Sequence, residues 1–75
     1  MSNFELVAME PFLKNYTLVR NGKTLGTVEA IIITNTIVSP TKLFVGDILT
    51  NNNGSHTIYS LVEVNEGTHY EGTCS

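Results

Sequence analysis

The chain has 75 residues, of which 41% are hydrophobic and only 15% charged, and its formal net charge is −3 at pH 7. A chain of this length forms one small domain with a thin margin of stability, and such domains usually need a disulfide, a metal or a partner. One cysteine excludes an internal disulfide, and four basic residues are few for binding that depends on phosphate contacts. We therefore expect a protein partner and no nucleic acid.

Targeting and membrane segments are not expected. Residues 1–13 lack the basic start and the apolar run of a secretory signal. The longest uninterrupted apolar run, Ala30 to Ile33, is far too short to cross a bilayer. These features predict a protein that is not secreted through a signal peptide and that has no membrane partner.

Residues 1–11 allow two interpretations. Ser2 and Glu5 fit a capping box, which predicts a short helix ending at Pro11. Alternation of apolar residues around Glu5 equally fits a strand. We expect a short helix or a loosely ordered arm in front of one domain over residues 12–75.

A hairpin is predicted around Asn21-Gly22, because this dipeptide favours the tight turn whose twist matches two antiparallel strands. Its strands run from Tyr16 to Arg20 and from Lys23 to Val28, and Gly26 predicts a bulge or bend in the second strand. A two-residue turn pairs Arg20 with Lys23, Leu18 with Leu25 and Tyr16 with Thr27, and places Tyr16, Leu18 and Leu25 on one face.

The stretch from Val28 to Val38 is rich in β-branched residues, which favour strands. Ile31, Ile32 and Ile33 are consecutive and cannot all face one side of a strand. Either both faces of the strand are covered there, or a bend redirects the chain near Thr34-Asn35. A strand with two apolar faces is a candidate contact surface, and a strand that crosses from one half of a barrel to the other explains the same pattern. The predicted protein-contact residues are Phe4, Leu6, Val7, Phe12, Ile31 and Ile33.

The second half predicts another hairpin and a final strand. Ser39-Pro40 ends the preceding strand and Gly46-Asp47 marks a turn. Strands then follow over 48–50 and 56–64 around the turn 51–54, and a last strand runs over 68–74. One face of the 56–64 strand is expected to carry Ile58, Ser60, Val62 and Val64. Five or six short strands with frequent turns predict an all-β fold, a small barrel or sandwich of antiparallel hairpins, without a visible internal repeat.

Residues capable of catalysis are present but not arranged for it. His69 and Cys74 lie five positions apart, so on a strand they point to opposite faces, and Cys74 stands where fraying is expected. His69 and Glu71 share a face, and with His56 or Asp47 they form the only conceivable metal set. Asp47 is better explained by a turn. We predict no catalytic residue, no metal and no cofactor.

The run from Leu43 to Thr50, a polar turn, and the run from Thr57 to Val64 resemble the tailed-phage head–tail joining proteins, which are small barrels of the Src-homology-3 type. The resemblance covers about Lys42 to Cys74. It implies a non-enzymatic structural protein of a virion, a head–tail connector whose oligomeric rings are joined by protein–protein contacts.

Two functions are therefore expected. The first is assembly within a phage or phage-like particle, with neighbouring subunits as partners and the virion or the host cytoplasm as location. The alternative is a small phage-encoded inhibitor or adaptor that binds one host protein or ligand, because short acidic chains can bind through a few buried aromatic anchors. The neighbouring genes would distinguish the two.

Overall fold

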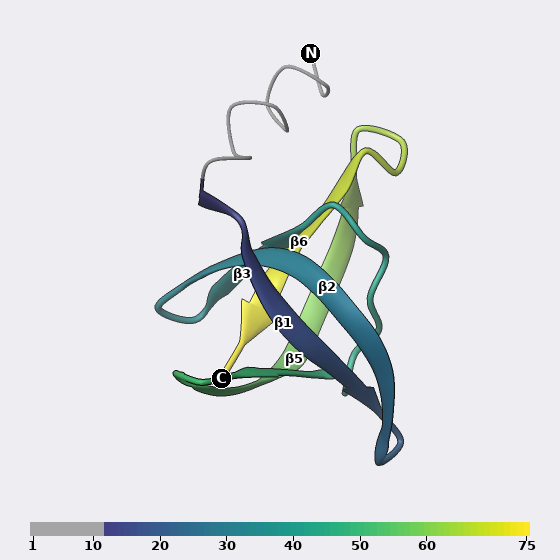
Figure 1. Ribbon diagram of the computed structural model, residues 1–75. Coiled ribbons are helices and arrows are strands. Elements are labelled where there is room, and N and C mark those ends of the chain that lie inside the picture. Colours follow the sequence, from purple (N-terminus) through teal and green to yellow (C-terminus); the bar gives the residue numbers. More distant parts are fainter. Residues whose placement is uncertain (1–11) are drawn as a thin grey trace.

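The computed structural model describes residues 12–75, which form a closed antiparallel barrel (Figure 1). The strands pair in the order β1-β2-β3-β6-β5-β4, and β4 pairs again with β1. The prediction of an all-β barrel with five or six strands is confirmed, with six strands. The interpretation of residues 1–11 as an arm or helix lies outside the described residues. The strand bounds are β1 Lys14–Arg20, β2 Lys23–Ile33, β3 Thr36–Ser39, β4 Ile48–Asn51, β5 Gly54–Val64 and β6 His69–Cys74.

Two similar halves make up the barrel. Strands β1 to β3 form one meander, β4 to β6 form another, and the contacts between them are β1 with β4 and β3 with β6. Exchanging the meanders leaves this strand order unchanged. At the β1–β4 contact Leu18 lies opposite Leu49, between the pairs Thr17–Thr50 and Val19–Ile48. The topology therefore contains an internal two-fold relation, which the sequence analysis did not detect.

The first hairpin has the predicted turn but a different register. Asn21 and Gly22 have φ values of 54° and 77°, as the tight turn requires, and Arg20 pairs with Lys23. The register then shifts, so that Leu18 lies opposite Gly26 instead of Leu25. The predicted bulge at Gly26 is present, with φ at 138°. Because the bulge adds one residue, Leu25 is 52% exposed, and its predicted place on the core face is wrong.

Strand β2 is long enough to pair with two neighbours in succession. Its first part pairs with β1, and its last residues, Ile31 to Ile33, pair with β3. Ile32 packs against the core, whereas Ile33 is 67% exposed. The interpretation of this run as a strand that crosses the barrel is confirmed. The chain then reverses at Thr34, whose φ is 56°.

The pairing of β5 with β6 also contains a bulge, which changes the predicted faces of β5. Ile58 lies opposite Cys74, and the register shifts before Ser60, which lies opposite Thr73. Beyond this shift, the side chain that packs against the core is that of Leu61. Val62 is 63% exposed. Ile58 is in the core as predicted, but the grouping of Ser60 and Val62 with it is wrong.

The core lies inside the barrel and includes the end of β6. Cys74 is buried, its main-chain N–H donates to Asn35 O at 2.9 Å, and its carbonyl accepts a hydrogen bond from Asn35 Nδ2 at 3.0 Å. The prediction that Cys74 frays is therefore wrong, because tertiary contacts hold the strand end. The buried hydrophobic residues are Tyr16, Leu18, Ala30, Ile37, Leu43, Leu49, Ile58 and Cys74.

Candidate protein-binding surfaces

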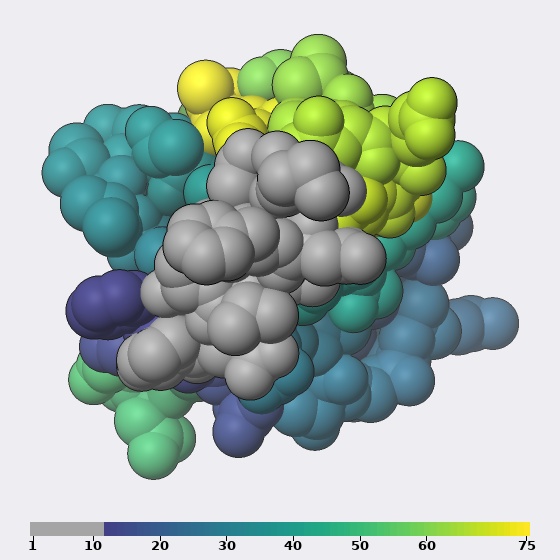
Figure 2. All heavy atoms as spheres, turned by 90° about the horizontal axis from the view of Figure 1, so that it is seen from above, coloured from purple at the N-terminus to yellow at the C-terminus, as the bar shows by residue number. Residues whose placement is uncertain are grey.

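An apolar groove lies where β2 and β3 meet the start of β1. It encloses about 510 Å³ and is lined by Phe12, Lys14, Ile31, Ile32, Ile33 and Val38. Ile31 and Val38 are cross-strand partners, which places β2 and β3 side by side in its wall. The turn between β2 and β3 forms a separate teal lobe at the side of the molecule in Figure 2.

Three of the predicted contact residues meet in this groove. Phe12, Ile31 and Ile33 all line it, and Phe12 and Ile33 are each 67% exposed. Phe4, Leu6 and Val7 lie outside the described residues. Lys14 is the charged residue of the described lining. The groove therefore offers hydrocarbon to an apolar side chain and one cation to a carboxylate beside it.

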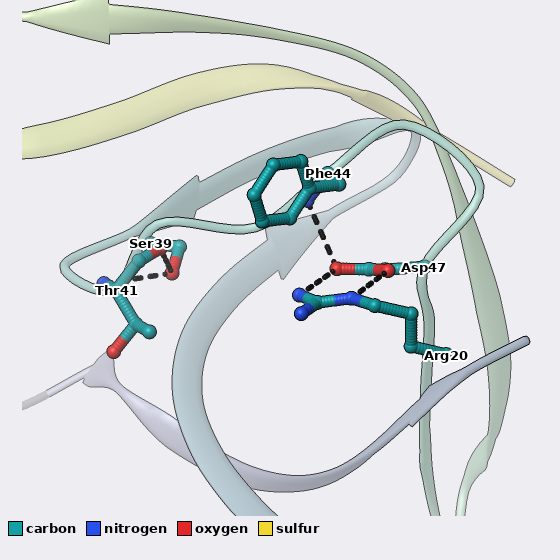
Figure 3. Close-up of polar contacts among 5 residues, drawn as sticks. All are labelled: Arg20, Ser39, Thr41, Phe44 and Asp47. Carbon is teal, nitrogen blue, oxygen red and sulfur yellow. Dashed lines mark hydrogen bonds and ion pairs between the residues drawn. The ribbon is translucent and has the colours of Figure 1, made fainter. Parts of the chain in front are cut away.

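A second cluster joins the β1–β2 hairpin to the loop before β4 (Figure 3). Arg20 holds Asp47 with both arms of its guanidinium: Nε donates to Oδ1 at 2.8 Å and Nη2 donates to Oδ2 at 2.7 Å. The main-chain N–H of Phe44 donates to the same Oδ2 at 2.9 Å. The N–H of Asp47 donates in return to Phe44 O at 3.0 Å. Asp47 thus has the predicted role in a turn, and it also anchors a distant strand.

The environment of Asp47 keeps its carboxyl group ionised. The hydrogen bonds from Arg20 lower its pKa below the ordinary value, and the Phe44 N–H acts in the same direction, while burial opposes both. The hydrogen bond to Asp47 likewise raises the pKa of Arg20. The side chain of Asp47 is only 2% exposed, so this bidentate pair fixes the loop against the hairpin.

Basic residues gather around the ring of Phe44. The Cζ atom of Arg20 lies 4.6 Å from the ring centroid and Nζ of Lys42 lies 5.6 Å from it, within the range of cation–π attraction. Lys23 is the cross-strand partner of Arg20. We define Arg20, Lys23, Lys42, Phe44 and Val45 as the basic surface.

Three of the four basic residues of the chain belong to this surface, and Phe44 and Val45 are 50% and 67% exposed. Sequence reasoning missed this surface, because Lys42 is far from the hairpin in the chain. Pairing of Arg20 with Lys23 was the only signal for it.

The residues weighed for chemistry do not converge. His69 is buried with Nε2 2.9 Å from Glu71 Oε2, while its Nδ1 has no hydrogen-bond partner among residues 12–75. Nδ1 of His56 lies 2.8 Å from the main-chain oxygen of Ser75. Burial raises the pKa of the Cys74 thiol, which lies in the core. Within residues 12–75 no group of three or more His, Cys, Asp or Glu side chains is placed to hold a metal ion.

Comparisons with protein-family models, with curated proteins and with solved structures give no match to this chain. The resemblance to phage joining proteins stays a prediction based on residues 42–74. Over the described part of the chain, no helix is long and apolar enough to cross a membrane. The groove and the basic surface are therefore the features of the molecule that bear on its function.

Proposed function

We propose that this protein is a non-enzymatic assembly protein that joins subunits of a phage or phage-like particle through protein–protein contacts. The observation that carries the proposal is the groove. Residues Phe12, Ile31 and Ile33 are separated in the chain, yet they line one hollow and leave apolar surface exposed to solvent. Exposed apolar surface of this kind marks sites of interaction. The phage assignment draws on the resemblance of residues 42–74.

The partner that fits the groove is an apolar protein segment that carries a carboxylate. Its apolar side chains would be removed from water against Ile31, Ile33 and Phe12, with roughly 25 cal/mol gained per Å² of apolar area. A carboxylate beside them would meet Lys14.

The absence of enzymatic activity is part of the proposal. A nucleophile needs a base within hydrogen-bond reach. Cys74 is buried in the core, Nδ1 of His56 contacts Ser75, and Nε2 of His69 contacts Glu71. Each of these groups already has a structural position.

The test is incorporation into particles. Ile33→Asp puts a charge into the groove at a side chain that is 67% exposed, so folding is retained while docking is lost. Ser55→Asp adds the same charge at an exposed position outside the groove. Mass spectrometry of purified particles should find the wild type and Ser55→Asp in fixed stoichiometry, and Ile33→Asp depleted about tenfold or more, as for loss of a central contact.

Two results would overturn the proposal. One is equal incorporation of Ile33→Asp and the wild type. The other is recovery of the chain in a one-to-one complex with a single soluble protein and never in particles, which would support the adaptor function instead.

A further inference from the structure

The charges of the described chain are segregated. Opposite in sign to the basic surface is the β5–β6 end, where Glu63, Glu66 and Glu71 are all exposed. Glu63 closes over the turn, since its Oε2 would lie 3.4 Å from a Cβ built on Gly67. Figure 1 shows the β1–β2 turn and the β5–β6 turn at opposite ends of the barrel. We define Glu63, Glu66, Glu71 and Val62, the cross-strand partner of Glu71, as the acidic surface.

Each of the two surfaces also exposes large apolar side chains. Phe44 and Val45 are 50% and 67% exposed on the basic surface. Val62, which lies opposite Glu71 on the acidic surface, is 63% exposed. Apolar side chains rimmed by charge are the usual composition of a protein interface. The two surfaces are therefore complementary in charge, and each exposes apolar side-chain area.

We propose that the basic surface of one copy binds the acidic surface of a second copy, head to tail. The inference rests on the proposed function, because it identifies the chain itself as one partner of the assembly. Three cations and the carboxylate of Asp47 leave two net positive charges on one side, and three carboxylates face them on the other. Such a contact is heterologous, so it generates a ring or a filament and not a closed dimer.

The geometry around Asp47 prepares the basic surface for this contact. Its hydrogen bonds to Arg20 and to the Phe44 N–H hold the guanidinium and the phenyl ring in place before any partner arrives. Side chains ordered in advance lose less conformational entropy on binding. Lys23 and Lys42, which are exposed and outside the ion pair, then supply the charge that meets carboxylates.

Nucleic acid is a poorer occupant of the basic surface. Phosphate binding needs several clustered cations, and here Asp47 already neutralises Arg20. The exposed side chains of Phe44 and Val45 can pack against apolar side chains of an acidic protein segment. A phosphate backbone has no apolar groups to place against them. Binding of an oligonucleotide in place of self-association would contradict the proposal.

The experiment uses two charge-reversed variants of the full chain. Lys23→Glu/Lys42→Glu makes the basic surface acidic, and Glu63→Lys/Glu66→Lys makes the acidic surface basic. Each alone should self-associate about tenfold or more weakly than the wild type in sedimentation velocity, because like charges then face each other. An equimolar mixture should recover assembly, because each reversed surface then meets an opposite charge. Glu29→Lys, at an exposed position outside the groove and both surfaces, is the matched control.

Salt provides an independent readout. Assembly of the wild type should fall in about 1 M NaCl, where screening acts over about 3 Å. A chain that stays monomeric at high protein concentration, assembly that both variants retain, or a mixture without recovery would overturn the inference. These failures are separate from that of the proposed function, which depends on Ile33→Asp and the groove. If the chain enters particles through the groove and charge reversal leaves its self-association unchanged, the proposed function stands and the head-to-tail contact does not.

Discussion

At the scale of single residues, Gly72 marks the closest approach of two strands. A Cβ built there would overlap the carbonyl oxygen of Ser60 and lie 2.9 Å from Leu61 Cα, both of them backbone atoms that cannot turn aside. We predict that Gly72→Ala lowers the free energy of unfolding by roughly 3 kcal/mol or more, which is the range of severe core changes. Denaturant unfolding followed by circular dichroism measures it.

A second glycine provides the control. Gly22 has φ at 77° and no atom within 4 Å of a built Cβ. Asparagine tolerates this conformation, so Gly22→Asn should change stability by no more than about 1 kcal/mol. A Gly72→Ala variant as stable as Gly22→Asn would contradict the close approach of β5 to position 72.

Cys74 should report on unfolding through its thiol. Burial raises its pKa, and the reactive thiolate is both scarce and inaccessible in the folded barrel. We predict that an aromatic disulfide reagent labels Cys74 only as fast as the barrel opens. In Ser55→Cys the added thiol, at an exposed position, should react at once while Cys74 stays protected. Rapid labelling of both thiols in the native protein would contradict the burial of Cys74.

The Asp47 carboxylate should make stability depend on pH in one direction. Its folded pKa is lower than the ordinary value of 3.8, so its contribution is complete well above that value and declines as pH falls through the folded pKa. We predict that Asp47→Asn is less stable than the wild type at neutral pH. The difference should shrink steadily in urea titrations taken from pH 5 to pH 2. A difference independent of pH would mean that the ion pair with Arg20 contributes nothing.

At the scale of strands, the tight turns were predictable from the sequence, but the strand register depended on bulges. Asn21-Gly22 predicts its own turn because both residues accept positive φ. Register beyond a turn depends on whether a bulge inserts one residue, and Gly26 signalled a bulge without fixing which side chain it would turn outwards. The alternation rule therefore misplaced Leu25 in the β1–β2 hairpin and Val62 in the β5–β6 hairpin.

Leucines 18 and 25 test this register directly. Leu18 is buried in the core, whereas Leu25 is the extra residue of the bulge and 52% exposed. We predict that Leu18→Ala costs about 2–5 kcal/mol of unfolding free energy. Leu25→Ser should stay within about 0.5 kcal/mol of the wild type. Similar losses of unfolding free energy at both positions would support the register without a bulge, in which Leu18 pairs with Leu25.

Contacts between distant segments were not predictable from the chain. Arg20 and Asp47 are 27 positions apart, and local rules explain only the turn role of Asp47. Three of the six predicted contact residues do meet in the groove, because consecutive isoleucines in a strand that crosses the barrel must leave some apolar surface outside. The basic surface required the barrel itself, which brings the loop at Phe44 beside the hairpin tip.

At the scale of the whole molecule, the two meanders should fold as one cooperative unit. A three-stranded meander of this size has no second layer to cover its apolar face, and each meander here is covered by the other. Leu49 is fully buried where they meet, opposite Leu18. Loss of this contact therefore exposes both halves at the same time.

Native-state hydrogen exchange can test this cooperativity with Leu49→Ala. We predict that the substitution lowers the opening free energy of strand amides in β2 and in β5 by the same amount, about 2–5 kcal/mol. The matched substitution Val45→Ala, at a side chain that is 67% exposed, should leave both values unchanged. If β5 lost protection while β2 kept it, the meanders would be independent units. The topological two-fold relation would then describe their arrangement without coupling their stability.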